Sequence, residues 1–152
     1  MHRRTLLTAL GATTATLGTG CLSSVEERFD PSVRLGWFGA HNFDTEPHQF
    51  DLQLTRDGTR VHHSSHEIRP RDGNYVHSGV ADCDWGSASG DYVVRARVDS
   101  NEWKEAPITE FLTSREPDCA VANAEYRDDG LQFFLRDGCD RDWNGTCSFI
   151  TR

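Results

Sequence analysis

The segment at residues 48–61 constrains the fold of this chain more than any other. Apolar residues alternate with polar ones in its first half, and these apolar residues are Phe50, Leu52 and Leu54. A period of two places one face of an extended strand on a core and the other face in water. Asp57 and Gly58 follow, the kind of pair that a two-residue hairpin turn prefers. The segment therefore predicts a β-hairpin with one buried face.

Further short apolar stretches are separated by turn signals along the rest of the chain. Residues 90–99 alternate in the same way, with Tyr92, Val94, Ala96 and Val98 on one face. Val33, Leu35 and Trp37 also alternate and predict a first strand at residues 33–37. Residues 121–126 and 131–135 predict a last hairpin with a three-residue loop, and short strands are expected at residues 76–80 and after Trp103. Residues 83–90 are rich in Gly, Ser and Asp and predict a surface turn. No long segment shows a helical period. About seven short strands predict an all-β fold, an antiparallel β-sandwich over residues 33–152.

The first twenty residues have the composition of an export signal. Arg3 and Arg4 precede an uncharged stretch at residues 6–20, which is too short and too weakly apolar for a membrane span. The paired arginines resemble a twin-arginine signal. The segment ends before Cys21 in a pattern that resembles a lipoprotein processing site, so we expect a lipid on Cys21 and a polar tether at residues 21–32. The alternative is ordinary cleavage nearby, which would leave Cys21 as a free thiol.

The cysteine count agrees with export. Lipidation of Cys21 leaves four of the five cysteines, an even number that is typical of disulfides outside the cell. Zinc sites usually hold cysteines two to four residues apart, and no pair here lies that close. Cys119 and Cys139 are equally distant from the turn residue Asp129, which favours their pairing and leaves Cys83 with Cys147. A local bond between Cys139 and Cys147 remains an alternative.

The charge of the chain excludes one class of partner. It has 24 acidic and 16 basic residues, a net charge of −8, and Lys104 is its only lysine. An acidic surface repels nucleic acid, so we expect no nucleic-acid partner. Acidic surfaces with almost no lysine resemble those of proteins from extreme halophiles.

Several segments together resemble one group of proteins. Residues 48–58, residues 90–99 and the pair Glu102-Trp103 resemble small secreted lipoproteins of halophilic archaea. The resemblance implies a single immunoglobulin-like or transthyretin-like domain on the outer face of the cell membrane. It implies no activity.

One loop resembles the start of a calcium site. Asp140, Asp142 and Asn144 place oxygen ligands at every second residue before Gly145. The glutamate expected at the twelfth position is replaced by Thr151, so any site would be weak. Asn144 also begins the chain's only glycosylation signal, and a glycan there would compete with calcium.

The histidines at positions 62, 63 and 66 suggest a metal cluster at first. On a strand, however, His62 and His63 face opposite ways, and His62 and His66 stand about 13 Å apart at about 3.3 Å per residue. We therefore expect exposed polar residues here and no metal. A copper site is disfavoured as well, since no histidine follows Cys83.

No catalytic motif is evident in the chain. It has no Gly-x-Ser-x-Gly nucleophile turn and no phosphate-binding loop before a helix. We therefore expect a non-enzymatic binding or surface-structural module with no cofactor, anchored through Cys21, whose partner outside the cell is a protein or a glycan.

The rival hypothesis is a small hydrolase or redox protein. It requires a polar pocket near one of the loop-proximal histidines, which are His41, His48, His62 and His77. Five aromatic residues could line a sugar-binding surface; on the alternative that we favour, several of them fill the core and shield disulfides. They are Trp37, Phe38, Trp85, Trp103 and Trp143.

Overall fold

The computed structural model describes residues 32–112 and 118–139, and the fold is given for these residues. Its strands are β1 (Arg34–Asn42), β2 (His48–Arg56), β3 (Thr59–Ile68), β4 (His77–Val80), β5 (Tyr92–Val98), β6 (Lys104–Pro107), β7 (Cys119–Arg127) and β8 (Gly130–Asp137). A single 3₁₀ turn, η1 (Ile108–Phe111), follows β6. Within these ranges no helix is long and apolar enough to cross a membrane.

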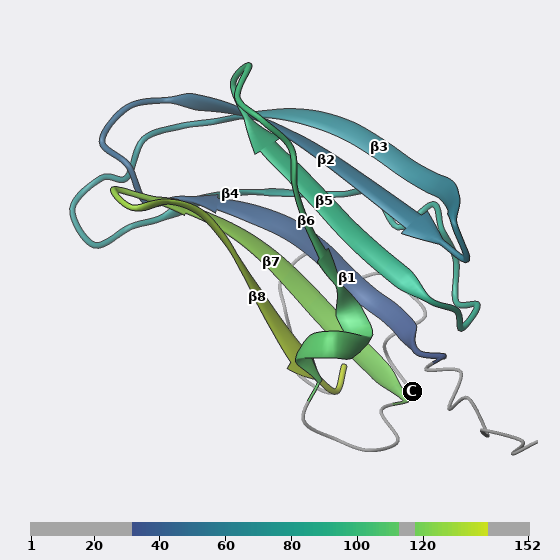
Figure 1. Ribbon diagram of the computed structural model, residues 1–152. Helices are drawn as coiled ribbons and strands as arrows, with labels where there is room; N and C mark the ends of the chain where they lie inside the picture. Colours follow the sequence, from purple (N-terminus) through teal and green to yellow (C-terminus); the bar gives the residue numbers. More distant parts are fainter. Residues whose placement is uncertain (1–31, 113–117, 140–152) are drawn as a thin grey trace, which may run out of the picture.

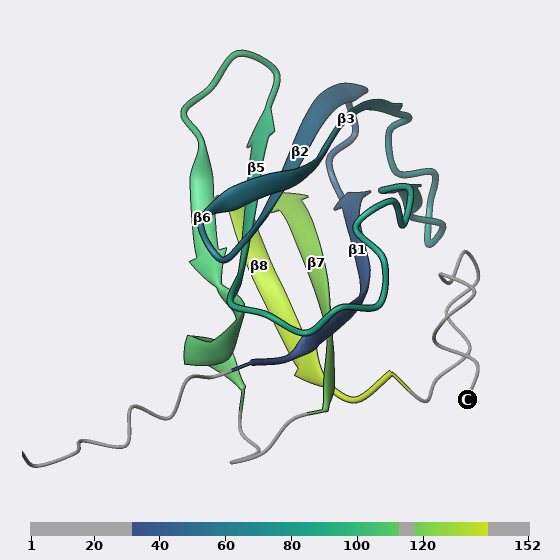
Figure 2. The ribbon, with the colours of Figure 1, turned by 90° about the vertical axis from the view of Figure 1, so that its right-hand side faces the viewer.

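The strands form two sheets of four that pack face to face (Figure 1). One sheet has the order β4-β1-β7-β8 and the other the order β3-β2-β5-β6. Figure 2 shows the two layers from the side. The predicted all-β sandwich is confirmed, with eight strands in the described part of the chain. One pairing differs from an all-antiparallel arrangement, because β1 and β7 run parallel.

The two strands with the clearest alternation lie next to each other in the second sheet. β2 pairs with β5 so that Leu52 lies opposite Ala96 and Leu54 opposite Val94. The inward residues of both strands are at most 2% exposed, as their alternation predicts. The predicted turn between β2 and β3 is also present, since Asp57 and Gly58 have φ values of 52° and 78°.

A β-bulge changes the face on which the first strand places its residues. The register of β1 against β7 shifts between Leu35 and Trp37. Leu35 and Phe38 therefore both lie in the main core, whereas Trp37 packs on the outside of the sheet against Val121 and the disulfide. Simple alternation in this strand placed Trp37 on the same face as Leu35, and that expectation was wrong.

The last hairpin carries the predicted disulfide with a slightly different register. Arg127 pairs with Gly130, so the loop has two residues where the sequence suggested three. Cys119 then lies opposite Gly138, whose N–H donates to the Cys119 carbonyl at 2.7 Å. Gly138 has a φ of 86° and leads the chain back to Cys139. The Cys119–Cys139 bond is confirmed, with Cα atoms 5.7 Å apart, and it excludes the alternative bond between Cys139 and Cys147.

The loop after β4 contributes to the core. The sequence suggested a surface turn here, but Trp85 is buried and its Nε1–H donates to the Leu35 carbonyl at 2.8 Å. Cys83 packs against the core nearby and is disulfide-bonded. Its partner lies outside the described residues, so the pairing with Cys147 stays a prediction.

Candidate functional site

The outer face of the β4-β1-β7-β8 sheet carries a hollow with polar and aromatic walls. The pairing of β1 with β7 places Gly39 beside Asn123 and His41 beside Glu125. The antiparallel pairing of β7 with β8 then adds Phe134 beside Asn123. Side chains of these three strands surround a cavity of about 250 Å³. Its principal lining residues are Trp37, His41, Asn123, Glu125, Phe134 and Arg136.

A hydrogen-bonded row forms the polar wall of this cavity. The side-chain Nδ2 of Asn123 donates to Nδ1 of His41 at 2.6 Å and to Oε1 of Glu125 at 3.0 Å. The other oxygen of Glu125 accepts from Arg127 at 2.6 Å. Asn123 is 9% exposed, and its Oδ1 is buried with no hydrogen-bond partner among the described residues. A buried acceptor without a donor is costly, which makes this amide unusual for a sheet surface.

The row also fixes the tautomer of His41. An amide nitrogen only donates, so Nδ1 of His41 accepts and the ring proton lies on Nε2. Burial lowers the pKa of His41 below its ordinary value; the charge of Glu125 acts to raise it, and Arg127 acts with burial. The neutral ring therefore presents an Nε2–H donor at the cavity.

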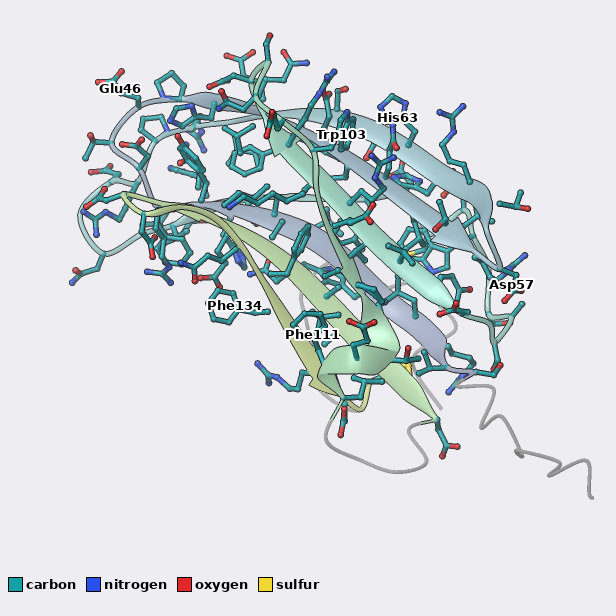
Figure 3. The ribbon with its side chains drawn as sticks, in the orientation of Figure 1. Glu46, Asp57, His63, Trp103, Phe111 and Phe134 are labelled. Carbon is teal, nitrogen blue, oxygen red and sulfur yellow. A yellow bond between two sulfur atoms is a disulfide. The ribbon has the colours of Figure 1, made fainter. Side chains whose placement is uncertain are left out.

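The apolar wall depends on a glycine. The indole of Trp37 lies across Gly39, where an added Cβ would stand only 2.6 Å from the ring. The glycine therefore leaves room for the ring, whose centroid lies 6.4 Å from that of the His41 imidazole. Phe134 is 48% exposed on the neighbouring edge strand and points away from the molecule on this side (Figure 3). An exposed aromatic ring beside buried polar groups is typical of ligand pockets.

The histidines of β3 form a second polar cluster, and the expectation that they are all exposed was wrong. His62 is 4% exposed and faces inward, whereas His63 is exposed on the outer side with Trp103 (Figure 3). Nε2 of His62 and Nε2 of His66 each lie 2.8 Å from the hydroxyl of Ser64. The two Nε2 atoms are therefore separated by at most twice 2.8 Å. The two rings converge although His62 and His66 lie four residues apart on the strand. No group of three His, Cys, Asp or Glu residues within the described ranges is arranged to hold a metal.

A third polar cluster, centred on His48, joins the two sheets at one end of the sandwich. Nδ1 of His48 lies 2.8 Å from Asp99, and Nε2 lies 3.0 Å from Asp44. The ring also packs edge-on against Tyr126 of the other sheet, with centroids 4.7 Å apart. Burial acts to lower the pKa of His48, but the hydrogen bonds and charges of Asp99 and Asp44 outweigh it and raise this pKa. This cluster is closed by its own ion pairs and has the character of a structural clasp.

The three tryptophans within the described ranges divide between packing and surface roles, and Trp143 lies outside those ranges. Trp85 fills the core, and Trp37 packs against the Cys119–Cys139 bond. The predicted packing role is thus confirmed for these two. Trp103 is partly exposed on the outer side of the second sheet, where Arg95 and Arg97 lie 5.2 Å and 4.8 Å from its ring centroid. Trp103 is therefore an alternative aromatic platform, although two arginines already occupy it.

The remaining predicted site residues lie outside the described ranges. They are Cys21, Asp140, Asp142, Asn144 and Cys147, so lipidation, calcium binding and glycosylation stay predictions. Sequence reasoning named His41 but missed Asn123 and Glu125. The signal available for these two was the stretch 120–125, in which alanine alternates with Val121, Asn123 and Glu125. That pattern places small residues inward and the others outward.

Comparison with known proteins adds no relative to this description. No family model matches the chain, and searches of curated proteins and of solved structures each gave no match.

Proposed function

We propose that the protein is a lipid-anchored, extracytoplasmic binding module that takes a saccharide into the cavity on its β1-β7-β8 face. The cavity itself carries this proposal. A sheet face exposed to water is ordinarily lined by polar side chains that solvent can satisfy. Here a buried amide with an unused acceptor lies between a neutral imidazole and two aromatic rings. Such a set of few polar groups against aromatic walls is how proteins orient small ligands.

The chemistry of the cavity favours a ring with hydroxyl groups. His41 offers a donor at Nε2, and Glu125 offers carboxylate oxygen already polarised by Asn123 and Arg127. A hydroxyl group both donates and accepts, so it suits a wall with both kinds of partner. The apolar face of a sugar ring suits the exposed ring of Phe134, while the buried Trp37 ring lines the cavity beside it. Charge balance argues against a strongly cationic ligand, since Arg127 and Arg136 lie beside the single carboxylate.

The proposed address rests on the cysteines and the first residues of the chain. Two described disulfide sites, at Cys83 and at Cys119–Cys139, suit an oxidising compartment. The paired arginines and the small residues before Cys21 suit export followed by lipidation. The resemblance to secreted lipoproteins of halophilic archaea agrees with this address and supplies the membrane as a partner through Cys21. In this proposal the domain binds without catalysing a reaction at the cavity and needs no resident cofactor.

Binding is testable with simple sugars on the mature chain. A ¹⁵N-labelled sample is titrated with glucose, galactose, mannose, N-acetylglucosamine and their disaccharides, while amide shifts are followed by NMR. We expect the saturable shifts to centre on Asn123 and Phe134 and to be lost in Phe134→Ala. The matched control is Trp103→Ala, which removes the aromatic surface of the other sheet and should leave the shifts unchanged. Shifts centred on Trp103, or no saturable shift with any sugar, would contradict the proposal.

A further inference from the structure

Four side chains at the open edge between β3 and β4 form a continuous hydrogen-bonded chain. Oδ1 of Asp84 lies 2.5 Å from Nδ1 of His62. Nε2 of the same ring lies 2.8 Å from the hydroxyl oxygen of Ser64, and that oxygen lies 2.8 Å from Nε2 of His66. Alternation along β3 brings His62, Ser64 and His66 to one face, and the loop after β4 supplies the carboxylate.

The chemistry of the four groups fixes the protons in the neutral state. The carboxylate of Asp84 accepts the Nδ1–H of His62, which leaves Nε2 of His62 as an acceptor. The Ser64 hydroxyl then donates to that nitrogen, and the Nε2–H of His66 donates to the Ser64 oxygen. Each hydrogen bond therefore points in the direction that draws the proton of Ser64 toward His62.

Packing holds His62 in this orientation. Its side chain is 2% exposed and meets the edge of the buried Trp85 ring, with centroids 5.4 Å apart. Across the gap between the sheets, the backbone of Gly79 approaches His66 so closely that an added Cβ would lie 2.9 Å from that side chain. Ser64 itself is partly exposed, and the Asp84 side chain is 59% exposed. The base is thus shielded, whereas the serine that it bonds lies partly at the surface.

We propose that Ser64 is the nucleophile of an acyl-transfer site that acts on small carboxylic esters, with His62 as its general base and Asp84 as the positioning residue of that base. An acid paired with a histidine that bonds a serine hydroxyl defines such sites by geometry, whatever their order in the chain. This site is independent of the sugar cavity, which lies on the outer face of the other sheet. It also goes against the expectation of a non-enzymatic module.

The reaction follows from the hydrogen bonds. The Ser64 oxygen attacks the ester carbonyl carbon as its proton moves to Nε2 of His62. The acyl–oxygen bond of the ester then breaks, and the proton on His62 passes to the departing alkoxide. Water, deprotonated by His62, releases the acyl group and restores the Ser64 hydroxyl. In the described sheet β3 has a neighbour on one side only, and an edge strand leaves alternate N–H groups free to stabilise an oxyanion.

Covalent labelling tests the proposal on the full mature chain. A fluorophosphonate probe forms a bond between phosphorus and a reactive serine oxygen and releases fluoride. We expect one label per chain, located at Ser64 by peptide mass spectrometry and absent in Ser64→Ala. Ser65 is the matched control. It follows on the same strand but faces the other way and donates to Asp51, so Ser65→Ala should label like the wild type.

A second variant separates a chemical role from a structural one. Asp84 is largely exposed, so Asp84→Asn should leave the melting temperature nearly unchanged. The labelling rate should nevertheless fall by roughly 100-fold or more, in the range found for acid–base groups, because the amide no longer fixes the tautomer of His62. The proposal would be overturned by either of two results. One is a wild-type protein that is labelled no faster than Ser64→Ala, and the other is an Asp84→Asn variant that is labelled as fast as the wild type.

Discussion

Among single residues, glycine and histidine decide what different parts of the sandwich can do. Gly39 leaves room for the Trp37 ring to lie on the sheet, so a buried aromatic surface exists outside the main core. Three histidines that are partly or fully buried, His41, His48 and His62, each have a different set of partners. One faces a cavity, one joins the sheets and one bonds a serine. The role of each histidine is set by the residues that it contacts, and the number of histidines in the chain does not indicate it.

The clasp at His48 predicts a pH-dependent contribution to stability. Its raised pKa means that this contribution is complete below the ordinary value of about 6.5 and is lost as the pH rises through the folded-state pKa. A hydrogen bond from His48 is the main cause that lowers the pKa of Asp44. For Asp99, burial opposes the change, but hydrogen bonds from Gln49 and His48 outweigh it and lower that pKa too. The carboxylate contribution is therefore present above about 3.9 and is lost in stronger acid. The clasp should stabilise most between about pH 4 and 6.5.

The substitution His48→Gln tests this window. We expect it to lower the melting temperature by a few degrees at pH 5.5, and by less at pH 9 and at pH 3. Thermal unfolding followed by circular dichroism at the three pH values measures the difference. His63→Gln is the control, since the described residues offer that exposed ring no hydrogen bond, and it should change little. An equal loss for His48→Gln at all three pH values would refute the charged clasp.

At the scale of elements, the sequence predicts the strands better than their registers. The β2–β3 hairpin and the buried face of β5 follow from alternation and turn chemistry alone, because both depend on neighbours in the chain. The bulge in β1 does not follow from alternation, since one extra residue between Leu35 and Trp37, Gly36, reverses the faces. A glycine inside a strand pattern is the one local signal for such a bulge. In the β7–β8 hairpin a loop one residue shorter than expected moved Cys119 opposite Gly138. The disulfide still forms as predicted, because the positive φ of Gly138 turns the chain so that Cys139 comes within bonding distance of Cys119.

The disulfide at the end of this hairpin gives a prediction for the whole element. The bond closes a loop with a sequence separation of 20. Loss of loop-closure entropy in the unfolded chain predicts that Cys119→Ala with Cys139→Ala lowers the free energy of unfolding by about 3 kcal/mol. Urea denaturation of the double variant measures this cost. Because both cysteines also pack against Trp37, a loss well below 1 kcal/mol would mean that the bond contributes almost nothing to this face.

At the scale of the whole molecule, function depends on contacts between distant parts of the chain. The candidate cavity needs His41 from β1 and Asn123 from β7, which meet only because these strands pair in parallel. The pattern of a single sequence does not reveal such a pairing. Alternation along β7 predicts that Asn123 and Glu125 lie on the outer face, but it does not predict that His41 lies beside them. The Asp84–His62 contact likewise joins a loop to an edge strand 22 residues away. The fold class was therefore predictable, whereas both sites required the three-dimensional arrangement.

The proposed role of this domain, a lipid-anchored module outside the cell, can be tested in a single experiment. The intact mass of the mature protein is determined after purification from its native membrane. We expect a chain that begins at Cys21, carries a diacylglycerol group and lacks four hydrogens because it contains two disulfides. An added hexose series would place a glycan on Asn144 and exclude calcium there. A chain that still begins at Met1 with free thiols would contradict the account.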